Sequence, residues 1–164
     1  MTKDQTKEKF ICAYNNYCDD IFKYCFFRVY DRDLAKDLAQ ETFIKMWKYL
    51  ADGKEIENFR AFAYKVAYHL VVDNSKKKKE YSLDGMLELG IEFSDGSKNK
   101  EQDTLDTLSI VQEINKLGGK YAEIVKMKYI DGLSTEEISL SLGVSSNMVY
   151  VRLHRGLEKI KENI

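Results

Sequence analysis

The 164-residue sequence contains no proline, only two histidines and only three cysteines. No run of about 18 apolar residues occurs, which excludes a membrane-spanning helix. The first ten residues, MTKDQTKEKF, lack the apolar core of a signal peptide, so we expect a cytoplasmic protein. With 44% hydrophobic and 32% charged residues, the composition is typical of a soluble, mostly helical protein rather than a disordered one.

Metal and catalytic sites have little support in this sequence. Cys12, Cys18 and Cys25 are odd in number and fit no zinc-binding spacing, so we expect small core residues in a reducing compartment. His154 has no partner His or Cys at ligand spacing. No Ser/His/Asp set, carboxylate cluster or Gly-rich phosphate loop is found, which argues against an enzyme. We therefore expect no metal and no cofactor.

The net charge of −1 conceals a strong segregation of charge along the chain. Residues 1–79 hold 16 Lys and Arg against 12 Asp and Glu, whereas residues 80–109 hold 2 against 8. Residues 110–164 are nearly balanced, with 8 basic and 7 acidic side chains. A globally basic DNA-binding protein is therefore excluded, but locally basic faces are not.

Apolar residues at helical spacing predict three helices in the first half, over 4–29, 31–50 and 59–77. Asp31 and Asn58 are candidate N-caps of the second and third helices. The predicted buried faces comprise Phe10, Tyr14, Tyr17, Ile21 and Tyr24 in the first helix; Leu34, Leu38, Met46 and Trp47 in the second; and Phe62, Val66, Leu70 and Val71 in the third, where Ala63 and Ala67 allow close approach.

Residues 80–103 are acidic, rich in Gly and Ser and weakly periodic, which is typical of a linker between domains. Helical periodicity resumes near Thr104 with Leu105, Leu108, Val111, Ile114 and Leu117, and a further helix is expected over 120–131. The predicted fold is all-α, with two small helical domains (1–79 and 104–164) joined by a flexible acidic linker.

The most informative segment is 119–164, which has the pattern of a helix-turn-helix. Ser134 and Glu137 form an S-x-x-E capping box, and Gly143 allows a tight turn. Ile138 and Leu142 give the short helix an apolar face; Ser145, Ser146 and Asn147 are N-cap candidates for the next one. That helix buries Val149, Leu153, Leu157 and Ile160 and leaves Tyr150, Arg152, His154 and Arg155 outside the stripe. This geometry can enter a DNA major groove, although a plain helical hairpin has the same pattern.

Three blocks of the chain resemble the extracytoplasmic-function (ECF) group of bacterial sigma-70 family sigma factors. The blocks are DLAKDLAQETFIKMWKYL at 33–50, FRAFAYKVAYHLVVDNSKKKK at 59–79, and the helix-turn-helix segment. The resemblance implies that the helix at 33–50 docks on the clamp helices of the largest core polymerase subunit. The implied polymerase-binding residues are Asp37, Gln40, Glu41, Ile44, Lys45 and Lys48.

The resemblance also implies two DNA-binding surfaces. The helix at 59–79 would read and melt the minus-ten element, the loop at 51–58 would capture a flipped base, and the lysine run 76–79 would hold phosphates. The implied minus-ten residues are Tyr64, Tyr68, His69, Val72, Asp73 and Lys76. The implied minus-thirty-five residues are Tyr150, Val151, His154 and Arg155, with Ser146, Asn147 and Arg152 as further candidates for phosphates or bases.

The sequence departs from the family pattern at two of these DNA positions. Tyr150 stands where many relatives carry a basic residue, and His69 stands where an Asn is usual. These changes affect the expected promoter preference rather than the class of function. Ser139 replaces the Ala typical of the helix before the turn, and it is still small enough for the two helices to cross closely.

The resemblance thus predicts a sigma initiation factor that binds core RNA polymerase and promoter DNA, helps to melt the promoter and is regulated by an anti-sigma partner. The alternative is a stand-alone helix-turn-helix regulator that binds an operator. Dependence on core polymerase distinguishes the two, because a regulator would bind its operator unaided.

Overall fold

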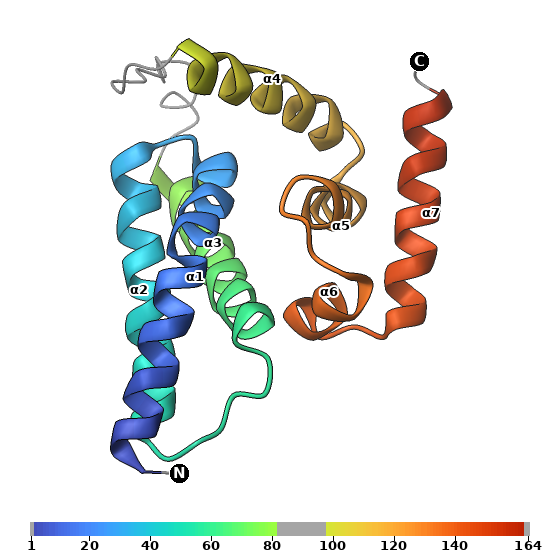
Figure 1. Cartoon of the computed structure of the whole chain (residues 1–164). Helices are drawn as coiled ribbons and strands as arrows, with labels where there is room; N and C mark the ends of the chain where they lie inside the picture. The colour runs from blue at the N-terminus through green and yellow to red at the C-terminus, as the bar shows by residue number, and fades with distance from the viewer. Residues whose placement is uncertain (1, 82–97, 163–164) are drawn as a thin grey trace. The chain divides into compact units, whose positions relative to one another are not determined.

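The computed structural model describes residues 2–81 and 98–162. For residues 78–81 and 98–102 it describes the backbone only. Every regular element in these two stretches is an α-helix, as predicted (Figure 1). The chain divides into two compact units, Met1–Ile91 and Glu92–Ile164, here called unit 1 and unit 2. Helices α1 to α3 lie in unit 1 and α4 to α7 in unit 2.

Unit 1 consists of α1 (Lys3–Val29), α2 (Arg32–Ala51) and α3 (Phe59–Tyr81). Its helix starts are fixed by side-chain caps, which satisfy amides that lack a partner in the first turn. The Asp31 carboxylate accepts a hydrogen bond from the backbone amide of Leu34 at 3.1 Å. The side-chain oxygen Oδ1 of Asn58 accepts one from the backbone amide of Ala61 at 3.0 Å. Both N-caps were predicted from the sequence and both are confirmed.

The core of unit 1 forms where all three helices contact one another. Ile21 of α1 and Met46 of α2 are fully buried, and so are Ala63 and Ala67 of α3. The two alanines leave room for α3 to lie close to its neighbours, as their spacing predicted. Burial of aliphatic and aromatic side chains at this three-helix junction is what holds unit 1 together.

Three predictions about this core are wrong. Trp47 was expected to be buried, but 38% of it is exposed, because the residue lies at the edge of the α1–α2 contact rather than beneath it. Of the three cysteines only Cys25 is a core residue; Cys18 is half-buried and Cys12 is exposed. Tyr14, also expected in the buried stripe, is 43% exposed. The apolar stripe of α1 is therefore wider near its N-terminus than the surface its neighbours cover.

Unit 2 consists of α4 (Lys98–Asn115), α5 (Gly119–Tyr129), α6 (Thr135–Leu142) and α7 (Ser146–Glu162). Because α3 continues to Tyr81 and α4 begins at Lys98, helices extend into both ends of the predicted linker at 80–103. The rest of that predicted linker, 82–97, lies outside the described residues. Within α4, Val111 is fully buried, whereas Leu105, expected in the same stripe, is 51% exposed.

The helix-turn-helix is formed by α6 and α7, as the sequence predicted. The Ser134 hydroxyl accepts from the amide of Glu137 at 3.1 Å, and the Glu137 carboxylate accepts from the amide of Ser134 at 3.2 Å, which completes the capping box. Gly143 ends α6 in the left-handed region with φ 69°. Ser139 donates to the carbonyl of Val144 across the turn at 2.5 Å, and the Ser145 hydroxyl caps α7 by accepting from Met148 at 3.1 Å.

A single glycine sets the distance between α7 and α5. A Cβ placed on Gly156 would lie 2.9 Å from Cγ2 of Val125 and 3.7 Å from Cβ of Tyr121. The first distance is below normal carbon contact, so a side chain here would push the two helices apart. Close contact of α7 with the rest of unit 2 therefore depends on glycine at this position.

We predict that Gly156→Ala destabilises unit 2 by about 1–3 kcal/mol through overpacking. Thermal unfolding followed by circular dichroism, with amide hydrogen exchange of α5 and α7, measures the effect. Gly119→Ala is the matched control, because a Cβ there would meet nothing within 4 Å. Equal stability of the two variants would contradict the packing argument.

Candidate nucleic-acid and protein interfaces

The outward face of α7 gathers the residues predicted to contact the minus-thirty-five element. Val149 and Leu153 are buried on one side of this helix, so the residues of its opposite side face solvent. Tyr150 is 62% exposed and Val151 is 37% exposed. Ser146, Asn147, His154 and Arg155 are also exposed, and Arg152 is half-buried. All seven side chains lie on one helix that is held from behind and capped at its start.

One of these side chains has a partner on its own helix. Nε2 of His154 lies 3.0 Å from Oε1 of Glu158, one turn further along α7, and the pair is ionic only when the imidazole is protonated. Both side chains are more than half exposed, so the interaction is weak in water. His154 therefore remains accessible to a ligand that approaches the outward face.

Five of the six α3 residues predicted to meet the minus-ten element are at least partly exposed, and the sixth is buried. His69, Asp73 and Lys76 are exposed, and Tyr68 and Val72 are half-buried. The ring of Tyr68 lies edge-on to His69, with 5.6 Å between centroids. These five side chains form a mixed aromatic and polar strip along α3.

Tyr64 was predicted to contact DNA, but only 1% of it is exposed. Its ring packs edge-on against the buried Tyr24 of α1, with centroids 5.4 Å apart, and the guanidinium of Arg60 lies 5.9 Å from its centroid. The side chain thus faces the interior of unit 1 and has no surface to offer a nucleic acid. Tyr64 is a core residue that supports α3 rather than a DNA contact.

The loop between α2 and α3 borders a small cavity of about 130 Å³. This loop is the segment predicted to capture a flipped base. Lys54 adds a positive charge 5.1 Å above the ring of Tyr49, which itself packs on Phe62 at 4.7 Å between centroids. The cavity is lined by Thr6, Lys9, Leu50, Gly53, Lys54, Glu55, Ile56 and Phe59.

The polar side of α2 presents the residues predicted to bind polymerase. Helical spacing places them on one face, and every one of them is exposed. Ile44 is an exposed aliphatic side chain among charged neighbours, with 53% of it in contact with solvent. The face comprises Asp37, Gln40, Glu41, Ile44, Lys45 and Lys48.

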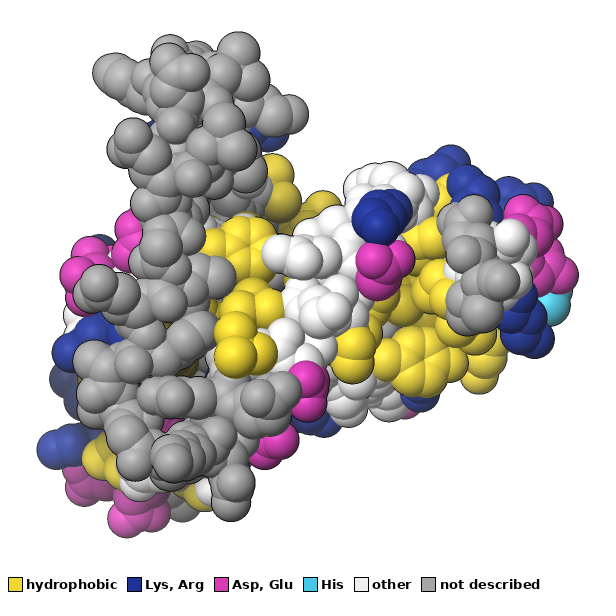
Figure 2. Space-filling view, turned by 90° about the horizontal axis from the view of Figure 1, so that it is seen from above, with side chains coloured by type: hydrophobic (Ala, Val, Ile, Leu, Met, Phe, Trp, Pro, Cys, Tyr) yellow, Lys and Arg dark blue, Asp and Glu magenta, His cyan; other side chains and the backbone are white. Residues whose placement is uncertain are grey.

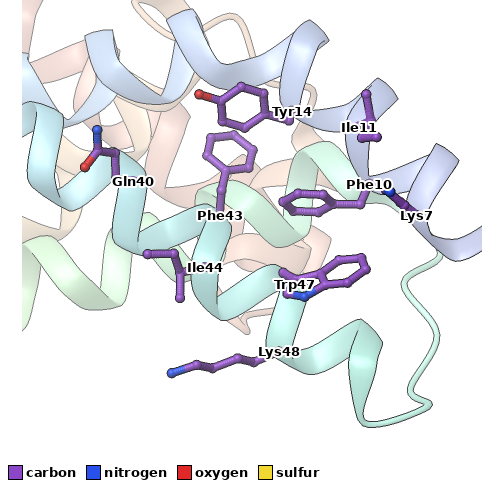
Figure 3. A pocket seen from close by; sticks show the side chains of 9 residues that line it. All are labelled: Lys7, Phe10, Ile11, Tyr14, Gln40, Phe43, Ile44, Trp47 and Lys48. Atoms are coloured by element: carbon purple, nitrogen blue, oxygen red, sulfur yellow. The ribbon is translucent and has the colours of Figure 1, made fainter. Parts of the chain in front are cut away.

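This polar face adjoins an apolar groove of about 600 Å³ between α1 and α2, which the sequence had not predicted (Figure 3). The ring of Phe10 lies 5.2 Å from that of Trp47, and Tyr14 packs edge-on to Phe43 at 5.0 Å. Figure 3 shows these four rings lining the groove from both helices. Its full lining is Lys7, Phe10, Ile11, Tyr14, Gln40, Phe43, Ile44, Trp47 and Lys48.

Gln40, Ile44 and Lys48 belong to both the polar face and the groove, so the two surfaces are continuous. Large exposed apolar patches mark sites of interaction with other proteins. The sequence signal was the excess of aromatic residues near the start of α1, which periodicity alone assigned to the core.

Within residues 2–81 and 98–162, no group of three or more His, Cys, Asp or Glu side chains is arranged to hold a metal ion. Among the described helices, none is both long enough and apolar enough to cross a membrane.

Both units match known protein families. Residues 13–81 match the family described as Sigma-70 region 2, and residues 107–160 match the one described as Sigma-70, region 4. The chain is 30% identical over 174 residues to the ECF RNA polymerase sigma factor SigW of Bacillus subtilis. That alignment covers 100% of this chain and 93% of SigW. It is 29% identical to the RNA polymerase sigma factor YlaC of the same organism, over 92% of this chain and 89% of YlaC.

Two solved structures share the fold at low sequence identity. CnrH, solved in complex with the cytosolic domain of CnrY, aligns with a TM-score of 0.68 at 18% identity, over 95% of this chain and 87% of CnrH. The sigma factor RpoE of Bartonella quintana, solved with the anti-sigma factor NepR, aligns with a TM-score of 0.66 at 18% identity, over 98% and 96% of the two chains.

Proposed function

Because the chain belongs to the ECF group of the sigma-70 family of bacterial RNA polymerase sigma factors, we propose that its two units bind different partners. A sigma factor binds core RNA polymerase, recognises the promoter and helps to open it, and this is the function of the chain. Such a factor initiates transcription and is not itself an enzyme. Unit 1 binds the core and the minus-ten element, and unit 2 binds the minus-thirty-five element. The observation that carries this division is that each family match falls within one compact unit.

The polymerase-binding surface in this proposal is the polar face of α2 together with the α1–α2 groove. The six predicted residues of α2 are exposed, and the groove adds apolar area that adjoins them. An interface core is typically apolar with an aromatic anchor, and its rim is polar. Phe10 and Trp47 have the chemistry of the anchor, and Lys48 and Gln40 have that of the rim.

Promoter opening is assigned to α3 and the loop before it. Extracting a base from the duplex costs a few kcal/mol, which a protein recovers by stacking the base or holding it in a pocket. Tyr68 and His69 are accessible rings on the proposed DNA face of α3, and the cavity beside residues 51–58 is the candidate pocket. Val72, Asp73 and Lys76 extend the same strip, while Tyr64 is left out because it is buried.

Recognition of the minus-thirty-five element is assigned to α7. The helix presents its N-terminal half outward, which is the part of a recognition helix that contacts base edges. Tyr150, Val151, His154 and Arg155 are the candidate contacts of this helix with the element. Ser146, Asn147 and Arg152 are the candidates for neighbouring phosphates or additional bases.

We also propose that an anti-sigma factor binds this chain and competes with the core. The support is that RpoE, which has the same fold, was solved with an anti-sigma factor. The exposed aromatic groove of unit 1 is a surface that such a partner could cover, and covering it would block the proposed polymerase site. A cytoplasmic site of action follows from the proposed partners, core polymerase and promoter DNA.

Dependence on core polymerase tests the proposed function. The purified chain, with cognate core RNA polymerase, is expected to select a bipartite motif from a randomised promoter library and to open it, as detected by permanganate reactivity. The chain alone is expected to bind the selected duplex poorly. Equal protection of the duplex with and without core would instead support a stand-alone regulator.

A further inference from the structure

Tyr121 of α5 lies among three positively charged side chains that come from two helices. The ammonium of Lys159 is 4.4 Å from the centroid of the Tyr121 ring, and that of Lys120 is 5.2 Å away. Arg155 lies one turn before Lys159 on α7, and its side chain is the main influence that lowers the pKa of the Tyr121 hydroxyl. In Figure 2, Lys and Arg side chains, coloured dark blue, lie beside Asp and Glu side chains, coloured magenta, over the part of unit 2 that contains α7.

The arrangement follows from helix spacing and from the close contact at Gly156. Arg155 and Lys159 are four residues apart, so they project from the same side of α7. Gly156 lies between them and brings α7 near the backbone and Cβ of Tyr121. The Tyr121 ring is consequently held at the flank of α7 that faces α5.

These charges are gathered without acidic partners. No ion pair joins Lys120, Arg155 or Lys159 to a carboxylate in the part of the chain that the structure describes. Glu158 of α7 pairs with His154 on the other flank. The negative face of an aromatic ring attracts each cation, but it leaves the net positive charge in place.

The Tyr121 hydroxyl responds to the same surroundings. The interaction with Arg155 lowers its pKa from the ordinary tyrosine value; burial partly opposes this, and the charges of Lys120 and Lys159 add smaller effects that also lower the pKa. The hydroxyl is thus an acceptor toward which Arg155 can direct one of its donors. Arginine held in this way presents its remaining donors to a ligand at a lower entropic cost.

We propose that Lys120, Arg155 and Lys159, organised around Tyr121, form a site for DNA backbone phosphates beside the recognition helix. The proposal rests on the proposed binding of α7 to the minus-thirty-five element. Phosphates line the edges of the major groove, so the outward face of α7 meets bases while its flank meets the backbone. Arg155 therefore holds a phosphate rather than reading a guanine, and Tyr121 is a positioning residue that acts through Arg155.

The test measures binding of the holoenzyme to the selected promoter and to every single substitution of its minus-thirty-five element, over a range of salt concentrations. Lys159→Gln is expected to weaken binding to all sequences equally and to reduce the slope of log K against log[salt] by about 0.9, the value for one phosphate. Tyr121→Phe keeps the ring and removes the hydroxyl. It is expected to weaken binding by about 2- to 10-fold without changing sequence preference, since it removes the acceptor that positions Arg155.

Lys161→Gln is the matched control, because Lys161 is an exposed lysine of α7 outside the cluster, and its salt slope is expected to stay at the wild-type value. An unchanged slope for Lys159→Gln would overturn the phosphate site while leaving the proposed function intact. The phosphate site would also be overturned if Arg155→Gln removed the preference at one base pair and left the salt slope unchanged. Arg155 would then contact a base rather than a phosphate. Failure of the wild-type holoenzyme to bind any promoter would overturn the proposed function, and this inference with it.

Discussion

Replacing Ile44 with Asp is expected to weaken binding of the chain to core RNA polymerase by about 30- to 1000-fold, the cost of losing an interface hot spot. Ile44 is 53% exposed, so the substitution leaves the core of unit 1 unchanged. It sits where the polar face of α2 meets the aromatic groove, and a charge there would have to be buried without a partner when the core binds. Fluorescence anisotropy of labelled protein titrated with core polymerase measures the change.

Ile110→Asp is the matched control for this experiment. Ile110 lies on α4 in unit 2 and is 52% exposed, so the two substitutions add the same charge at nearly the same exposure. Its affinity for the core is expected to remain within about 3-fold of wild type, in line with surface substitutions outside an interface. Equal losses for both variants, or none for Ile44→Asp, would show that the α2 face and groove do not dock on the polymerase.

Replacing Tyr150 with Ala is expected to reduce promoter binding by the holoenzyme by about 10- to 100-fold, because loss of one specific base contact costs about 1–3 kcal/mol. The side chain is 62% exposed on the outward face of α7, which leaves the helix-turn-helix core intact. The loss should be confined to promoters with the preferred base pair opposite this residue. Binding to the full set of minus-thirty-five substitutions therefore shows a flattened preference at one position.

Tyr129→Ala provides the matched control, because Tyr129 is a 57% exposed tyrosine of the same unit that lies outside α7. Promoter affinity and sequence preference are both expected to stay at the wild-type level. If Tyr150→Ala lowered affinity for all sequences to the same extent, Tyr150 would be a backbone contact, and the base-reading assignment would be wrong.

Much of the candidate DNA surface could be read from the sequence because local signals define it. The capping box of Ser134 and Glu137 and the glycine at 143 fix where α6 starts and stops. The four-residue spacing of Val149 and Leu153 then decides which side of α7 is buried. Once a helix has a defined start and one buried face, its outward residues follow from geometry.

The sequence was less informative about which aromatic side chains are buried. Tyr64 and Tyr68 are one turn apart on α3 and are chemically identical, yet only Tyr64 is buried, because Tyr24 of α1 packs against it. Trp47 was assigned to the core by its hydrophobicity, but α1 and α2 leave a groove at that level. In both cases the outcome depends on a partner from another helix.

The sequence by itself determined the helices, their caps and the family, since these depend on residues close together in the chain or on motifs in fixed order. Only the tertiary structure decided that aromatic residues of α1 and α2 form an open groove and that Tyr121 meets Arg155 and Lys159. The physical reason is that helical periodicity specifies the direction of a side chain from its own axis. It does not specify how closely a second helix approaches, which in unit 2 is set by the missing side chain of Gly156.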